Sequence, residues 1–351
     1  MISLALLLLA QDVFVAGQDG YHTYRIPSAI VSSKGTVLAF CEGRKKGTSD
    51  TGDIDLVLKR SADGGATWGP LQVVWDDAEN TCGNPCPVVD GATGTVWLLL
   101  THNLGRDTEK QIVEEKSQGT RTAWASRSDD DGVTWSKPVE ITKDVKKAGW
   151  TWFATGPGVG VQTRAGRLVV PCDSKYALGK KGASLVISSD DRGKTWKAGG
   201  AVGDTFGESQ VVELSDGRLM LNMRTMNSPR RERGVATSAD GGATWSEPAH
   251  DAALVEPVCQ ASILRYSWEP SRILFSNPAT AKTRTQLTVR MSLDEGKSWP
   301  VAKELHAGPS AYSCLVRLPD GGIGCLYECG SKSPYERLAF QRLTLASLEV
   351  R

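Results

Sequence analysis

One eight-residue pattern, Ser-x-Asp-x-Gly-x-Thr/Ser-Trp, occurs five times in this chain of 351 residues. The copies occupy residues 61–68, 128–135, 189–196, 238–245 and 292–299. They therefore recur at intervals of roughly 50 to 65 residues, a period that indicates an architecture built from repeated structural units. A single globular core with unrelated elements would not repeat one motif in this way.

Each copy of the pattern lies between two β-like segments. Apolar, β-branched runs such as Ile54–Leu58, Ala183–Ile187 and Leu287–Met291 come directly before three of the copies. The Asp carboxylate is suited to accept hydrogen bonds from the amides of a tight turn, and the Gly that follows supplies a positive φ. The Trp is expected to pack its ring beneath the turn. Each copy thus predicts a strand, a turn and a strand.

A unit of this length suits one four-stranded blade of a β-propeller. Residues 11–351 have room for about six such units, so we predict one all-β domain, a six-bladed β-propeller with the repeats in its turns. The 37 glycines agree with a chain rich in tight turns. No long amphipathic helix is visible, and the polar stretch 110–119 is expected to form a lid or an irregular insertion.

The first ten residues are predicted to be a signal peptide, or what remains of one. Their apolar run, residues 4–10, is too short to span a bilayer as a helix, which needs about 20 apolar residues. The predicted location is therefore outside the cytoplasm, either periplasmic or secreted. The run lacks a basic segment before it, so an incorrectly assigned start of the chain is the alternative.

The eight cysteines stand mostly in apolar, strand-like surroundings, where buried free thiols are expected. If the protein is exported, one or two disulfides are the alternative. Cys82 and Cys86 form a lone pair without the second pair that a zinc site requires. The four histidines are scattered, so no metal site is predicted. The glycines of 156–160 precede no helical pattern, and no cofactor is implied.

The formal net charge is only +1, so the composition gives no sign of a nucleic-acid partner. Any attraction for an acidic ligand must come from a local cluster of basic residues. No further apolar run is long enough to predict a membrane span.

Besides the repeats, several short motifs carry arginine, glutamate and tyrosine in a fixed order along the chain. They are Tyr24-Arg25-Ile26-Pro27, Gly207–Gln210 followed by Leu221–Arg224, Arg284–Leu287, Ala311–Leu315 and Leu326–Glu328. With these motifs the chain resembles the sialidase (neuraminidase) family of bacteria and animals, in which the repeats are called Asp-boxes. The resemblance covers residues from about 12 to 345. Asp-boxes also occur in propellers that bind ligands without chemistry, so the ordered motifs are the more specific signal.

The resemblance implies that Arg25, Arg224 and Arg284 form a triad that binds the sugar carboxylate. Sialic acid carries this carboxylate on its anomeric carbon, and planar guanidinium groups bind carboxylates in a bidentate manner. Arg290 is the rival for the third position, although its place inside an apolar run favours an outward-facing strand residue. Arg44 is similar to a further arginine of the family that lies near the ring hydroxyls.

The resemblance also implies a tyrosine nucleophile, Tyr312, in place of the carboxylate that most retaining glycosidases use. A neutral phenol avoids repulsion from the anionic sugar, but its pKa of about 10 requires a base, and Glu208 is the candidate. Asp50 is the expected acid/base, on a Gly-flanked loop and with a raised pKa, and Asp53 is the alternative. Glu328 is expected to orient Arg25 through a charge-assisted pair.

Two loop segments are candidates to line a pocket for the N-acetyl group, residues 84–87 and residues 150–156. The function implied is that of a retaining exo-α-sialidase, expected to be monomeric, that acts on sialylated glycoproteins, glycolipids or oligosaccharides. Three alternatives remain: a trans-sialidase or anhydro-forming sialidase, a non-catalytic propeller that binds sialoglycans, and a structural propeller. The structural alternative predicts no convergent arginines.

Overall fold

The computed structural model describes residues 10–178, 182–226 and 228–349, and these residues are built mainly of antiparallel strands. The all-β prediction is therefore confirmed. Residues 1–9 of the predicted leader lie outside the described residues, and β1 begins at Gln11. The helices in the described ranges are short: α1 (Glu109–Val113), α2 (Thr142–Val145) and α3 (Leu345–Glu349). None of these helices has the length or apolar character of a membrane span.

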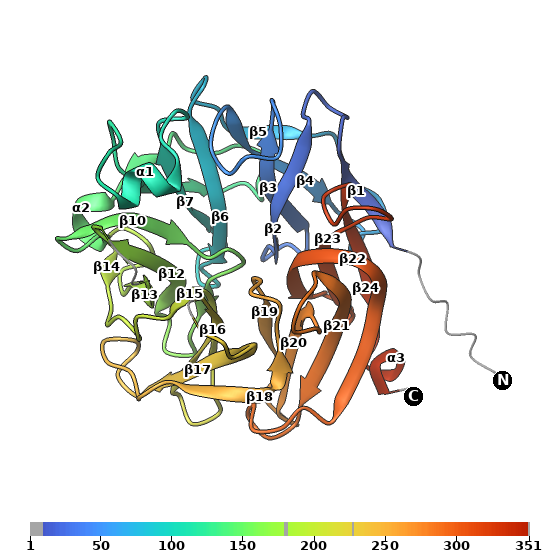
Figure 1. Cartoon of the computed structure of the whole chain (residues 1–351). Coiled ribbons are helices and arrows are strands. Elements are labelled where there is room, and N and C mark those ends of the chain that lie inside the picture. The colour runs from blue at the N-terminus through green and yellow to red at the C-terminus, as the bar shows by residue number, and fades with distance from the viewer. Residues whose placement is uncertain (1–9, 179–181, 227, 350–351) are drawn as a thin grey trace.

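The strands are arranged radially around a common centre, and the chain passes once around this ring from its N-terminal to its C-terminal strands (Figure 1). The first sheet has the order β2 (Thr23–Val31), β3 (Val37–Arg44), β4 (Ile54–Ser61), β6 (Thr81–Val89), β7 (Val96–Asn103), β8 (Thr122–Ser128), β9 (Val139–Glu140), with β5 (Gln72–Trp75) beside β4. The second has the order β10 (Trp150–Thr155), β12 (Leu168–Tyr176), β13 (Gly182–Ser189), β14 (Lys197–Ala198), with β11 (Val161–Gln162) beside β12.

The remaining strands form two sheets. One has the order β15 (Phe206–Glu213), β16 (Leu219–Thr225), β17 (Glu232–Ser238), β18 (Ala249–Val255). The other has the order β1 (Gln11–Val15), β24 (Arg337–Leu343), β23 (Ile323–Cys329), β22 (Val301–Arg317), β21 (Thr285–Ser292), β20 (Arg272–Pro278), β19 (Ser262–Ser267). Because β1 pairs with β24, strands from the two ends of the chain complete the ring.

The Asp-box turns have the hydrogen bonds expected from their sequence. In the first copy, Asp63 accepts from the amide and the hydroxyl of Thr67, at 2.9 and 2.6 Å, and from the hydroxyl of Ser61 at 2.7 Å. These hydrogen bonds lower the pKa of Asp63 to about 2. The Trp68 ring meets the Phe340 ring edge to face, with centroids 5.2 Å apart. Each turn is therefore closed by its own side chains and anchored by its Trp.

All eight cysteines are buried free thiols, as their apolar sequence surroundings predicted, and the disulfide alternative does not apply. The polar stretch 110–119 contains most of α1 and continues as an irregular segment. Thr108 caps α1 in a reciprocal capping box with Gln111. The first residue of α1, Glu109, reaches the cavity described below.

Candidate active site

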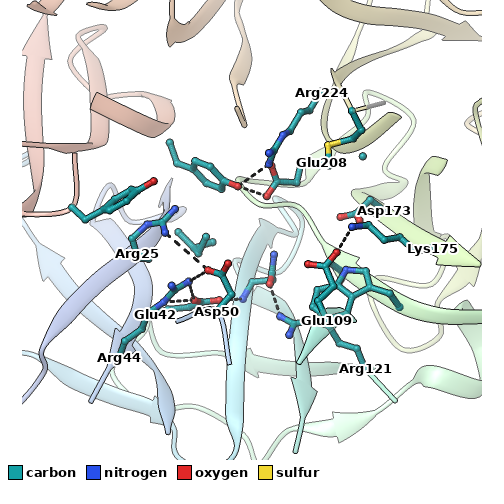
Figure 2. Close-up of a pocket in the computed structure, with 18 of the residues that line it drawn as sticks. Arg25, Glu42, Arg44, Asp50, Glu109, Arg121, Asp173, Lys175, Glu208 and Arg224 are labelled. Atoms are coloured by element: carbon teal, nitrogen blue, oxygen red, sulfur yellow. Dashed lines mark hydrogen bonds and ion pairs between the residues drawn. The ribbon is translucent and has the colours of Figure 1, made fainter. Parts of the chain in front are cut away.

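A cavity of about 320 Å³ lies where residues from several sheets converge (Figure 2). Its charged lining residues are Arg25, Glu42, Arg44, Asp50, Glu109, Arg121, Asp173, Lys175, Glu208, Arg224 and Arg284. The uncharged ones include Ile26, Asn84, Trp152, Ala154, Met226, Tyr312 and Tyr335. Six of these charged residues are basic and five are acidic, so the cavity gathers a local cluster of basic groups although the whole chain is close to neutral.

Irregular strand pairing aims several of these side chains into the cavity. The pairing register shifts between Arg25 and Ser28 in β2, and between Ser310 and Ser313 in β22. A similar shift in β15 surrounds Glu208. A β-bulge of this kind re-aims a side chain that a regular strand would direct elsewhere. Ile26 has a φ of 62°, a strained value for a β-branched residue, at the bulge beside Arg25.

Tyr312, Glu208 and Arg224 form a compact hydrogen-bonded triangle. The Tyr312 hydroxyl donates to Glu208 Oε1 at 2.6 Å, and Arg224 Nη1 donates to the same hydroxyl oxygen at 3.0 Å. Arg224 Nη1 also donates to Glu208 Oε2 at 2.5 Å. Burial, followed by the Glu208 charge, raises the pKa of Tyr312 well above its ordinary value, so the resting phenol is neutral.

The other two predicted arginines approach the same tyrosine ring. The guanidinium carbon of Arg25 lies 5.4 Å from the Tyr312 ring centroid, and that of Arg284 lies 5.5 Å from it. Tyr335 connects the two arginines: its ring lies 3.9 Å from the Arg25 guanidinium carbon, and its hydroxyl accepts from Arg284 Nη1 at 2.9 Å. The structure thus brings Arg25, Arg224 and Arg284 together around one phenol.

Glu328 is fully buried behind these groups and fixes two of them. Its Oε1 accepts from Arg25 Nε at 2.6 Å and from the amide of Ile26 at 3.0 Å. Its Oε2 accepts from the amide of Tyr312 at 3.0 Å. One carboxylate therefore sets the position of an arginine and of the tyrosine backbone.

Asp50 lies at the mouth of the cavity, on the loop between β3 and β4, with its side chain 74% exposed. Its Oδ1 is 2.7 Å from Arg44 Nη2 and 4.0 Å from Arg25 Nη1. Partial loss of hydration favours a higher pKa, but the charges of Arg44 and Arg25 outweigh it and lower the pKa of Asp50. The expectation of a raised pKa is therefore wrong, because the carboxylate is paired rather than shielded.

Arg44 is itself buried, with 2% of its surface exposed. Its Nη2 donates to Glu42 Oε2 at 2.6 Å, and its Nη1 donates to the Thr48 carbonyl at 2.6 Å. Arg44 therefore joins the floor of the cavity to the loop that carries Asp50.

The two rival residues do not line the cavity. Asp53 is largely buried and pairs with Lys45 at 3.1 Å, and Arg290 lies within β21. The two segments proposed for an N-acetyl pocket do supply lining residues, Asn84, Trp152 and Ala154. Their assignment to loops is wrong, however, because they lie in β6 and β10.

Six charged or aromatic lining residues are absent from the predicted site: Glu42, Glu109, Arg121, Asp173, Lys175 and Tyr335. Arg121 is buried, and its guanidinium donates to Asn84 Oδ1 and Asn103 Oδ1, each at 2.5 Å. For Asp173 the sequence does contain a signal, since a charged residue follows the apolar run that ends at Cys172.

Across the residues that the structure describes, no three His, Cys, Asp or Glu side chains gather into a possible metal site.

The chain is similar to several known proteins. A family profile described as a BNR repeat-like domain matches residues 35–325. A sialidase of Micromonospora viridifaciens is 37% identical over 348 residues, which cover 94% of this chain and 53% of the relative. An exo-alpha-sialidase of Aspergillus fumigatus is 33% identical, covering 93% of this chain and 85% of that protein.

Human sialidase-3 is 30% identical to this chain, with 92% of the chain and 89% of the human protein covered. Among solved structures, the Hadza microbial sialidase Hz136 matches with a TM-score of 0.88 and 32% identity, over 97% of this chain and 69% of that one. The chain therefore belongs to the sialidase family of glycoside hydrolases. It spans about half the length of the Micromonospora sialidase.

Proposed function

We propose that this protein is a retaining exo-α-sialidase that hydrolyses terminal α-linked sialic acid from glycoconjugates. The observation that carries the proposal is the placement of three guanidinium groups around the hydrogen-bonded pair of Tyr312 and Glu208. A binding protein needs the arginines alone. The buried phenol–carboxylate pair beside them is the arrangement of a nucleophile and its base.

Arg25, Arg224 and Arg284 are proposed to bind the carboxylate of the sugar. Each guanidinium presents planar, paired donors that match a carboxylate. Glu328 and Tyr335 hold two of these arginines in place before the ligand arrives, so little side-chain entropy is lost on binding. This carboxylate contact also places the anomeric carbon, which bears the carboxylate, close to the Tyr312 hydroxyl.

Tyr312 is proposed to attack the anomeric carbon while Glu208 accepts its proton. The 2.6 Å hydrogen bond already joins the donor and acceptor of this transfer. Because the resting phenol is neutral, it meets the anionic sugar without charge repulsion, and the proton leaves only as the new bond forms. The glycosyl–tyrosine intermediate is then hydrolysed, which gives overall retention of configuration.

Asp50 is proposed to protonate the leaving oxygen and later to activate water. Its lowered pKa is compatible with this role, because a bound ligand changes its surroundings. The sugar carboxylate neutralises part of the charge of Arg25, and the sugar ring covers Asp50 from solvent. Both effects favour the protonated acid in the complex.

The test of the proposal is the substitution Tyr312→Phe, assayed by release of sialic acid from a fluorogenic α-sialoside. We expect kcat to fall by more than about a thousand-fold, because the nucleophile is lost. Binding of free sialic acid should persist, because the arginines remain. Tyr266→Phe is the matched control, since it removes a phenol that donates to the Gly321 carbonyl outside the cavity.

Full activity in the Tyr312→Phe variant would exclude the proposed nucleophile. A wild-type protein that binds sialic acid but releases none from sialosides would instead be a non-catalytic binding protein. NMR analysis of the products separates hydrolysis from transfer to a second sugar and from formation of an anhydro sugar.

We also infer that the four sheets divide into six units. Five have four strands each, and in the sixth β10 and β11 both pair with β12, next to β13 and β14. The first sheet has a natural boundary between β4 and β6, which share only the parallel pair Ile54 and Thr81. The long strand β22 changes partner between Pro309, which pairs with β21, and Ser310, which pairs with β23. Division at these two points gives a six-bladed propeller closed by β1.

A further inference from the structure

One acidic side chain of the cavity differs from the others in its surroundings. Asp173 lies on β12, lines the cavity and is 5% exposed. In the part of the chain that the structure describes, no group donates a hydrogen bond to its carboxyl. Lys175, on the same strand, pairs instead with Glu109 of α1. Figure 2 shows Asp173 and Lys175 across the cavity from Arg25 and Arg44.

Burial of a carboxylate without a compensating partner is costly, so the neutral acid is favoured. The charged groups that face Asp173 are Glu208 from β15, Lys175 from its own strand, Glu109 from α1, and Arg121, the residue directly before β8. Burial, then the Glu208 charge, raises the pKa of Asp173 to about 7, although Lys175 and Arg121 act in the opposite direction. Near neutral pH this side chain is therefore present in both forms.

We propose that Asp173 is a substrate-binding residue that contacts the bound sugar as a protonated carboxylic acid, donating a hydrogen bond to a hydroxyl or carbonyl oxygen. The proposal rests on the sialidase function proposed above. Two physical effects support it. Protonation turns this carboxyl into a hydrogen-bond donor toward the cavity, and the ionised form adds a negative charge to a cavity that must accept an anion.

Ligand binding and protonation of Asp173 are then linked. A ligand that binds the protonated form raises the pKa of Asp173, so its affinity falls as the pH rises above the pKa of the free protein, about 7. The effect is a gradual loss of affinity by up to about tenfold per pH unit. An asparagine at this position is a permanent, neutral donor and removes the linkage.

The experiment is a calorimetric titration of free N-acetylneuraminic acid into the full chain between about pH 5.5 and 8.5, a range that brackets the pKa of Asp173. For the wild type we expect the affinity to decrease above about pH 7. Asp173→Asn should bind with little loss at about pH 6 and lack that decrease. Asp173→Ala should bind about 5- to 30-fold more weakly at that pH, which corresponds to the loss of one hydrogen bond.

Asp216→Asn is the matched control, because it removes an exposed carboxylate that pairs with Arg218 outside the cavity. Thermal unfolding at about pH 8 measures, independently of ligand binding, how much the ionised Asp173 destabilises the folded protein. There Asp173→Asn should be at least as stable as the wild type, which must hold an ionised, unpaired carboxylate. Because the pKa of Asp173 is higher in the folded than in the unfolded protein, this group lowers the stability of the folded protein as the pH rises from about 4 to 7.

Two results would overturn the assignment: an Asp173→Asn variant whose affinity follows the wild-type pH dependence, or an Asp173→Ala variant with wild-type affinity in mildly acidic buffer. A failure of the sialidase proposal is distinguishable from both. In that case the wild type itself would not bind N-acetylneuraminic acid or cleave a sialoside, whichever residue occupies position 173.

Discussion

At the scale of single residues, the site depends on a carboxylate that never meets the ligand. Glu328 accepts three hydrogen bonds, from the Arg25 side chain and from the amides of Ile26 and Tyr312. It therefore connects β2, at one end of the chain, with β22 and β23, at the other. The position of the proposed nucleophile relative to one of its arginines is fixed by this contact.

Replacing this carboxylate in Glu328→Gln should impair catalysis more than it impairs folding. The glutamine side chain has the same shape as the glutamate, but its NH₂ group cannot accept a hydrogen bond. It must face either Arg25 Nε and the Ile26 amide or the Tyr312 amide, so at least one hydrogen bond to the former carboxylate is lost. A loss of about 2 kcal/mol predicts a decrease in kcat/KM of about 30-fold. Steady-state kinetics on a fluorogenic sialoside measures this decrease in kcat/KM. Glu79→Gln is the control, because the Glu79 side chain is exposed. Unchanged kinetics in a folded variant would contradict the positioning role.

How far the site is predictable from the sequence also differs between residues. The proposed arginines, Tyr312 and Glu208 stand in contiguous motifs, so pattern alone singles them out. The sequence prediction misses Asp173 because this residue stands in no recognised motif and reaches the cavity only through its place in β12, which continues to Tyr176. Arg121 and Tyr335 carry no local signal. Their importance arises from neighbours on other strands, Asn84 for Arg121 and Arg25 for Tyr335.

At the scale of elements, the Asp-box turns connect neighbouring parts of the ring. In every copy the glycine at the fifth position has a positive φ, from 77° to 92°. A Cβ added to Gly65, Gly193 or Gly242 would collide with Phe340, Trp97 or Val186, at 2.1 to 2.4 Å. A Cβ on the other two would come within 3.0 Å of Leu38 and Met220, a tight contact. The turn chemistry is readable from the sequence because it is local. The β-bulges that aim the site residues are not, since they depend on pairing between strands.

The effect of the positive φ of an Asp-box glycine can be separated from the effect of its close packing. The comparison is between Gly65→Ala, in the first Asp-box, and Gly17→Ala. Gly65 has a φ of 91° and a Cβ added to it would lie 2.1 Å from the Phe340 ring, whereas Gly17 has a φ of 81° and open space around it. Both variants should lose about 1–2 kcal/mol of stability, because alanine is strained at a positive φ. Gly65→Ala should lose about 1–3 kcal/mol more from overpacking. Equal denaturant midpoints for the two variants would show that the close approach to Phe340 does not matter.

At the scale of the whole molecule, ring closure explains why six units contain only five Asp-boxes. In the division proposed above, each box joins the third and fourth strands of a unit. In the last unit these strands are β24 and β1, which come from opposite ends of the chain, so no turn connects them. The first Asp-box compensates in part for this missing turn, because its Trp68 and Gly65 pack on Phe340 of β24. Closure therefore relies on the pairing and packing of β1.

Phe14 of β1 is the side chain on which that closure should depend most. It is fully buried in a cluster with Leu326, Leu338 and Phe340, and its ring lies 5.2 Å from that of Tyr24. Phe14→Ala should lower the free energy of unfolding by about 3–5 kcal/mol, because it removes a large buried ring and leaves a cavity. Val139→Ala, at a side chain that is 64% exposed, should change it by less than about 0.5 kcal/mol.

The readout that distinguishes ring closure from general core packing is hydrogen exchange. If β1 closes the ring, Phe14→Ala should accelerate exchange first at the amides of β24 and β23, while those of β12 and β13, in another sheet, keep their protection. Loss of closure should also reach the site, because β23 carries Glu328 and β2 carries Arg25. Uniform acceleration in every sheet would instead indicate that the ring opens only by complete unfolding, with no preferred seam between β1 and β24.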